Sequence, residues 1–321
     1  MSTRVDFAPL DGITKAVFRR VWHRRFGGAD RYFMPFFSPT DQHIVTNRDR
    51  RELDPANNGG LTLVPQVMSR RAPDFLWAAE LLGDLGYTEV NLNLGCPSGT
   101  VTAKGKGSGF LARPEELERF FDEVFASVRL PVSVKTRLGY QEPEEFYHLM
   151  EIYNRYPIAC LTIHPRVRPE LYKGTVHRDF FAWAVKESRN PLCYNGDLLT
   201  AEDLQSIMTS FPTVEAVMVG RGAVADPALL RKFRGGAAAT REELMAFTAE
   251  LYQSYQAFYG QVGPAAQRMK EVWFYLIRLF EGGDKHSKRM RRLRTPGEYE
   301  AVEAAIFQEL PLRDHAVGPF V

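Results

Sequence analysis

Residues 90–97 read Val90-Asn91-Leu92-Asn93-Leu94-Gly95-Cys96-Pro97, and a glycine-rich polar loop continues from there to Gly109. The run alternates, so its aliphatic residues share one face of a predicted strand and Asn91 and Asn93 share the other. We expect Asn93 to point toward a bound ligand. Gly95 and Pro97 fix the backbone around Cys96, which favours a thiol held in one place over a buried structural cysteine. An α/β barrel carries its chemistry in loops that directly follow strands.

Short β-rich runs alternate with longer helical stretches on both sides of this segment, as in βα units that feed a parallel sheet. Amphipathic helices are predicted over 73–85 and 114–128, and the second begins with a proline and two glutamates. Eight βα units favour a TIM (β/α)8 barrel over a doubly wound sheet. The eight strands are predicted at 5–8, 32–36, 61–66, 89–93, 132–135, 160–164, 192–195 and 216–219.

The β signal stops after Arg234-Gly235-Gly236-Ala237, and helical patterns run from there to about residue 310. We therefore predict a domain boundary near residue 236. Residues 1–236 form the catalytic barrel in this prediction, and residues 237–321 form a C-terminal all-helical domain.

The length and composition fit an intracellular protein with one large domain and a small appended one. A chain of 321 residues is long enough for a barrel of about 250 residues with a small appended domain. The three cysteines, Cys96, Cys160 and Cys193, are too few for a disulfide framework and show no CxxC spacing for zinc. No apolar run has the length of a signal peptide or a membrane span. We expect a monomeric cytoplasmic protein with no metal and no membrane contact.

The formal net charge of +2 is too small to indicate nucleic-acid binding, but the charge is unevenly distributed. Residues 268–294 hold nine basic residues and three acidic ones, a net charge of +6. A solvated helix face is the alternative, yet this segment is a candidate surface for an RNA backbone. Its aromatic residues fit a core better than a base-stacking platform, because Trp273, Leu276, Ile277 and Phe280 follow helical spacing.

Polar residues fall at the ends of several predicted strands, where a barrel gathers its functional groups. Ser133, Lys135 and Arg137 share one face of their strand. Because an unpaired buried lysine is costly, Lys135 needs an anionic partner, which is a ligand or a structural ion pair. His164 ends another strand, where a satisfied core histidine is the alternative.

A phosphate site is predicted after the last two strands. Asn195-Gly196-Asp197 and Gly220-Arg221-Gly222 supply glycines that expose backbone amides, with an arginine to pair a dianion. Loops after strands seven and eight are the usual phosphate-binding place in TIM barrels. Ordinary βα connections remain the alternative.

The ordered motifs resemble those of the tRNA-dihydrouridine synthases. Asn93-x-Gly-Cys-Pro followed by Lys104-Gly-x-Gly-Ser is similar to that family's signature, and the other motifs follow in the family's order over residues 4–235. These are Ala8-Pro9-Leu10-Asp11-Gly12-Ile13-Thr14, Val64-Pro65-Gln66, Ser133-Val134-Lys135-x-Arg137, Thr162-x-His164, Asn195-Gly196-Asp197 and Val219-Gly220-Arg221-Gly222. The chain departs from the family at His164-Pro165-Arg166, where the family commonly has His-Gly-Arg.

The resemblance implies an FMN-dependent reductase that adds hydrogen across the C5–C6 bond of uridine in tRNA, with NADPH as the electron donor and NADH as the alternative donor. It implies Cys96 as the catalytic proton donor to C5. Cys96 can donate a proton only as a thiol and not as a thiolate. Nearby lysines and arginines are expected to lower the pKa of this thiol. The resemblance implies that Lys135 lies at the N1/C2 edge of the flavin. The other implied cofactor residues are Pro9, Leu10, Asp11, Gln66, His164, Asn195, Gly196, Asp197, Gly220 and Arg221, and the implied substrate residues are Asn93, Lys104, Arg137 and Arg166.

Two other functions fit parts of the pattern. The first is an FMN barrel oxidoreductase that acts on a free pyrimidine or another small molecule, for which the basic C-terminal segment has no use. The second is a non-catalytic RNA-binding barrel, which has no need of Cys96, Lys135, His164 or the phosphate turns.

Overall fold

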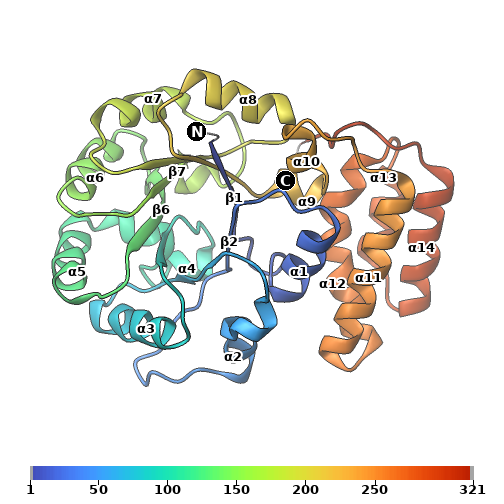
Figure 1. The fold of residues 1–321 in the computed structure, drawn as a ribbon, viewed down its shortest axis with the longest axis horizontal. Helices are drawn as coiled ribbons and strands as arrows, with labels where there is room; N and C mark the ends of the chain where they lie inside the picture. The colour runs from blue at the N-terminus through green and yellow to red at the C-terminus, as the bar shows by residue number, and fades with distance from the viewer. Residues whose placement is uncertain (1–2, 319–321) are drawn as a thin grey trace.

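The computed structural model describes residues 3–318 and shows a parallel β-barrel ringed by helices, with further helices against one side (Figure 1). The ends of the two predicted domains, residues 1–2 and 319–321, lie outside the described residues. The strands are β1 (Arg4–Phe7), β2 (Arg31–Phe33), β3 (Leu63–Val64), β4 (Gln66–Val67), β5 (Val90–Leu94), β6 (Val132–Gly139), β7 (Leu161–Val167), β8 (Leu192–Asn195) and β9 (Ala216–Val219).

The third predicted strand is divided into β3 and β4 at Pro65, and this division closes the barrel. Hydrogen-bonded neighbours follow the order β3-β2-β1-β9-β8-β7-β6-β5-β4. β3 pairs with β2 on one side and β4 pairs with β5 on the other. Pro65 has no N–H to donate, but its carbonyl accepts from the Asn91 amide at 2.9 Å. The nine short strands therefore fill the eight positions of the predicted TIM barrel.

Two strands are longer than predicted. β6 continues past Lys135 to Gly139, with a register shift between Arg137 and Gly139, and β7 continues past His164 to Val167. The extra residues place Arg137 and Arg166 on strands rather than in loops.

The longer helices of the barrel cover its outer face. In α5 the buried residues Leu117, Phe120, Phe121 and Val124 recur at helical spacing and turn toward the sheet. The others are α1 (Ala16–Arg25), α2 (Asn47–Leu53), α3 (Ala72–Asp84), α4 (Gly99–Thr102), α6 (Glu145–Tyr153), α7 (Arg178–Glu187), α8 (Ala201–Ser210), α9 (Arg221–Ala225) and α10 (Leu229–Phe233), with α5 at Pro114–Ser127 and 3₁₀ turns η1 (Pro55–Asn58), η2 (Gly107–Ala112) and η3 (Arg168–Glu170).

The C-terminal region is helical, as predicted, and packs on the barrel beside α1 (Figure 1). It comprises α11 (Arg241–Tyr259), α12 (Val262–Leu276), η4 (Ile277–Leu279), α13 (Asp284–Arg292) and α14 (Pro296–Glu309). Phe247 of α11 meets the ring edges of Phe18 and Phe26, at centroid distances of 6.0 and 5.4 Å. Buried side chains of both regions form one continuous core, and the boundary near residue 236 stays a prediction. In the part of the chain that the structure describes, no helix is long and apolar enough to cross a membrane.

Candidate functional site

A cavity of about 390 Å³ opens at the carboxyl ends of the barrel strands. This volume lies within the usual range for small-molecule sites. Its wall takes residues from the ends of the strands all around the barrel and one residue, Tyr275, from α12. Among the predicted site residues, the cavity is lined by Pro9, Leu10, Asp11, Gln66, Asn93, Cys96, Lys135, Arg137, His164, Asn195, Gly196, Asp197, Gly220 and Arg221.

Cys96 is held by its backbone on both sides, as the sequence predicted. The Asn93 side-chain oxygen accepts from the amides of Gly95 and Cys96 at 3.1 and 3.0 Å. The Cys96 carbonyl accepts from the amide and the hydroxyl of Ser108 at 3.1 and 2.9 Å. Gly107 has a φ of +56°, and a Cβ there would lie 2.8 Å from the Cys96 carbonyl oxygen, so only glycine fits. The loop presents a fixed thiol at the cavity wall.

Burial raises the pKa of the Cys96 thiol above its usual value. The sequence predicted the opposite sign, because it counted the cations but not the loss of water around the sulfur. Arg137 and Lys135 do lower the thiol pKa, yet burial outweighs them. The raised pKa keeps Cys96 protonated near neutral pH, which is the form that a proton donor needs.

The cavity floor concentrates positive charge. Burial, and then the charge of Arg137, lowers the pKa of Lys135 to about 8, and no carboxylate within residues 3–318 contributes to it. The expected partner of Lys135 is therefore not a structural ion pair. Burial likewise lowers the pKa of Arg137 to about 10. Burial and the surrounding cations lower the pKa of His164 well below its usual value, so the ring is neutral. An anionic ligand would relieve all three groups.

Arg166 and Asp197 brace the predicted phosphate loops. Arg166 donates twice to the Asp197 carboxylate, at 3.0 and 2.6 Å, and Arg221 donates to the same carboxylate at 2.8 Å. Arg166 also donates to His164 Nε2 at 3.1 Å, which places the imidazole proton on Nδ1. The remaining N–H groups of Arg166 donate to the carbonyls of Lys173 and Gly174. These contacts join the end of β7 to the loops after β8 and β9.

The phosphate loops are closely packed where they meet. α9 begins at Arg221, so its first amides have no acceptor within the helix and are available to an anion. A Cβ at Gly222 would lie 2.2 Å from the Leu198 carbonyl oxygen, which requires glycine at this position. The described loops thus have the amides, the arginine and the close approach of backbone that a phosphate group needs.

Two predicted substrate residues lie elsewhere. Arg166 does not line the cavity, and its five N–H groups are all donated within the protein. Because Pro165 continues β7 as a strand, the Arg166 side chain is buried and turned to Asp197. Lys104 lies in a neighbouring surface groove with Lys106, and both sit beside Arg70 and Arg71 in that groove.

The sequence reasoning missed several residues of the cavity wall, among them Leu171, Tyr172 and Tyr275. The Tyr172 ring lies under two guanidinium groups, 4.5 Å from Arg221 and 5.4 Å from Arg137. Leu171 and Tyr172 are exposed apolar residues in a polar loop, a signal that the sequence contained. Tyr275 falls outside the spacing of the buried residues on α12, which also indicated a separate role.

The basic segment is divided between internal and exposed residues. Arg268 contacts the Gly12 carbonyl and Glu271, and Lys270 donates to the Leu293 carbonyl at 3.2 Å. On α13 one face is buried through His286, Ser287 and Met290. The exposed face of α13 carries Lys285, Lys288, Arg289, Arg291 and Arg292. The four aromatic and aliphatic residues predicted for the core, Trp273, Leu276, Ile277 and Phe280, are buried.

Comparisons with known proteins agree with these features. The family model for dihydrouridine synthase (Dus) matches residues 6–310. A "Probable tRNA-dihydrouridine synthase 1" of Synechocystis sp. is 30% identical over 286 residues, which are 85% of this chain and 78% of that relative. A "tRNA-dihydrouridine(16) synthase" of Ralstonia nicotianae is 30% identical over 240 residues, 73% of each chain. A solved structure of morphinone reductase is 15% identical and shares the barrel fold with a TM-score of 0.53, over 74% of this chain and 87% of that one. The chain belongs to the dihydrouridine synthase family, which confirms the flavin-dependent tRNA-dihydrouridine synthesis expected from its motifs.

Proposed function

We propose that this protein binds FMN in the cavity, takes electrons from NADPH and reduces the C5–C6 bond of uridine in tRNA. The observation that carries the proposal is that a fixed, protonated Cys96 shares the cavity wall with Lys135, a buried cation with no carboxylate partner among residues 3–318. A buried positive site beside a thiol suits an anionic cofactor and a substrate that needs a proton.

Residues along the cavity wall would hold each part of FMN. Asn195, Gly196, Gly220 and Arg221 would hold its phosphate, with Asp197 keeping Arg221 in place. Lys135 would meet the N1/C2 edge of the ring system, where its ammonium regains a partner. Gln66 and His164 line the same wall, and Pro9, Leu10 and Asp11 would lie beside the ring. When bound, FMN supplies the hydride that is delivered to C6 of the uracil.

The chain's own residues would then complete the reduction. Cys96 would give its Sγ proton to C5, on the face of the uracil opposite the hydride. Arg137 is anchored by donating to the carbonyls of Gly95, Val167 and Leu171, and its remaining N–H groups could stabilise negative charge on the base. Asn93 offers an amide N–H beyond the one that it gives to Gln66. Tyr172, at the cavity mouth, presents an aromatic face on which a base could stack.

Two basic surfaces of the protein suit the RNA backbone. The first is the groove next to the Cys96 loop, where Lys104, Lys106, Arg70 and Arg71 outnumber the two acidic residues, Asp41 and Asp74. The second is the exposed face of α13. A uridine in folded tRNA must turn out of its stack to reach Cys96, and the cations of these two surfaces would hold phosphates of the RNA backbone. A free pyrimidine needs neither surface. We further propose that the protein acts as a cytoplasmic monomer.

The experiment that tests this function compares tRNA from cells with and without the gene. Total tRNA is purified and its dihydrouridine positions are mapped. We expect one or more positions to lose dihydrouridine in the deletion strain and to regain it when the wild-type protein is supplied. Unchanged dihydrouridine at every position, in a strain that has no second enzyme of this family, would refute the proposal.

A further inference from the structure

A line of buried polar side chains runs down the inside of the barrel, from the Cys96 loop to the opposite end. Asn93 donates to Gln66 at 2.7 Å, and Gln66 donates to Asn91 at 2.7 Å. Asn91 donates to the Ser133 hydroxyl at 2.9 Å, and Ser133 donates to Glu89 at 2.5 Å. Gln66 and Asn93 line the cavity, whereas Asn91, Ser133 and Glu89 lie outside its wall.

The cavity end of the line fixes the direction of every bond in it. The backbone amides of Gly95 and Cys96 only donate, so Asn93 must turn its oxygen to them and its nitrogen to Gln66. Gln66 therefore accepts through Oε1 and presents Nε2 to Asn91. Asn91 accepts through Oδ1 and is left with Nδ2 for Ser133.

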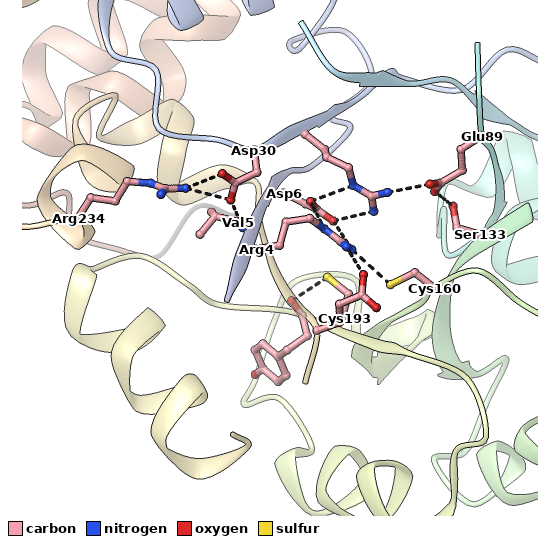
Figure 2. Close-up of polar contacts among 12 residues, drawn as sticks. Arg4, Val5, Asp6, Asp30, Glu89, Ser133, Cys160, Cys193 and Arg234 are labelled. Carbon is pink, nitrogen blue, oxygen red and sulfur yellow. Dashed lines mark hydrogen bonds and ion pairs between the residues drawn. The ribbon is translucent and has the colours of Figure 1, made fainter. Parts of the chain in front are cut away.

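The far end of the line requires the same direction independently. The Glu89 carboxylate accepts from Ser133 on one oxygen and from Arg31 on the other, at 2.7 Å (Figure 2). Arg31 is held in turn by Asp6 at 3.1 Å. An arginine only donates hydrogen bonds and a carboxylate paired with it only accepts them. Ser133 must therefore donate its hydroxyl hydrogen to Glu89 and accept a hydrogen bond from Asn91. Two ends that agree leave no alternative amide orientation between them.

This agreement matters at Gln66, whose two amide atoms are nearly the same in shape and opposite in hydrogen bonding. We propose that Asn91 is a positioning residue for the flavin site: held by Ser133 and Glu89, it acts together with Asn93 to hold the amide of Gln66 in the one orientation that its contact with the bound flavin requires. The inference rests on the proposed function, because it takes Gln66 as a partner of the isoalloxazine. Asn91 is fully buried below Gln66, so it acts through Gln66 and not on the ligand.

The test is a double-mutant cycle on the full-length protein. Asn91→Leu keeps the branched shape of the side chain, although leucine is larger, and it removes the acceptor for Gln66 Nε2. The Gln66 amide is then held by Asn93 alone and can move more freely. We expect FMN to bind about 2- to 10-fold more weakly, the range for one neutral hydrogen bond, and the visible absorption bands of the bound flavin to move. In a Gln66→Ala background, Asn91→Leu should cause no further change in either quantity.

Two further variants complete the design. Ser133→Ala breaks the line one step beyond Asn91 and should shift FMN binding and the absorption bands in the same sense but less, and it serves the cycle if Asn91→Leu fails to fold. Glu215→Gln is the control, because Glu215 pairs with Arg4 at the same end of the barrel and is connected to the line only indirectly, through Arg4, Asp6 and Arg31. It should bind FMN as the wild type does.

The outcomes separate this inference from the function on which it rests. Wild-type FMN binding and spectra in Asn91→Leu, or an undiminished effect of Asn91→Leu in the Gln66→Ala background, would overturn the inference alone. An effect of Glu215→Gln equal to that of Asn91→Leu would also overturn it. If Gln66→Ala itself leaves FMN binding and the flavin spectrum unchanged, Gln66 does not contact the flavin, and the inference is refuted as well. A wild-type protein that takes up no flavin would overturn the proposed function.

Discussion

Replacing Arg221 with alanine should weaken FMN binding without unfolding the protein. In the structure Arg221 donates to Asp197 at 2.8 Å, and Arg166 donates twice to the same carboxylate. Because Arg166 remains in Arg221→Ala, Asp197 is not left as an unpaired buried charge, and the fold should be retained. The loss falls on the phosphate, where a charge-assisted hydrogen bond contributes about 1.5 to 3 kcal/mol. The dissociation constant for FMN should rise by roughly 10- to 150-fold.

The assay is titration of flavin-free protein with FMN and, in parallel, with riboflavin, which lacks the phosphate. Arg221→Ala should bind riboflavin about as well as the wild type does, so that the variant loses most of its preference for FMN over riboflavin. Arg234→Ala is the control, because Arg234 pairs with Asp30 at 2.9 Å, on residues that do not line the cavity. Undiminished FMN affinity in Arg221→Ala would refute this phosphate site, and an equal loss for riboflavin would show that the arginine acts on the ring system instead.

Three other predictions follow from the cavity and the basic surface. Lys135→Met should raise the melting temperature of the flavin-free protein at pH 7, because the pKa of Lys135 in the fold is lowered to about 8 and its buried charge costs stability. The gain in melting temperature should shrink between pH 8 and about 10.5, because the folded protein loses this charge before the unfolded chain does. A gain that stays constant over this pH range would count against the buried charge. Gly222→Ala should lower stability by about 1 to 3 kcal/mol and release FMN, because its methyl group would meet a backbone carbonyl, whereas Gly297→Ala, with open space around it, should do neither in a thermal melt. Neutralising three exposed cations of α13 should weaken tRNA binding, and flavin reduction by NADPH should be unchanged. A plot of the logarithm of the tRNA association constant against the logarithm of the salt concentration should become less steep by about 2 to 3. An unaltered slope would show that this face is only a solvated surface. The three cations are Lys288, Arg291 and Arg292.

The sequence predicted the barrel and most of the cavity wall because both follow from local patterns. The predicted strand ends at Asn93, Lys135 and His164 were visible as polar residues within or after β-rich runs, and the glycine turns near Arg221 were visible as breaks after them. A barrel brings such ends together whatever the details of packing. The position of these residues on one wall therefore needed no knowledge of their contacts.

The remaining features depend on distances that no local pattern contains. Arg166 was expected to bind substrate, but its guanidinium donates to the carboxylate of Asp197, which is 31 residues away in the chain. The sign of the Cys96 pKa shift depends on burial, which outweighs the cations that the sequence displayed. The division of the third strand at Pro65 follows from barrel closure, since its two halves pair with different neighbours.

The most direct test of the account is the reoxidation of reduced flavin by tRNA in Cys96→Ala. NADPH should bleach the flavin of this variant at the wild-type rate, because that step involves no uridine. When unmodified tRNA is then added without oxygen, the flavin should reoxidise more slowly by roughly 10² to 10⁴-fold, the loss expected for a positioned general acid. Cys193→Ala, which removes a fully buried thiol outside the cavity wall, should reoxidise as the wild type does. Reoxidation and dihydrouridine formation at wild-type rates in Cys96→Ala would contradict the central role given to Cys96.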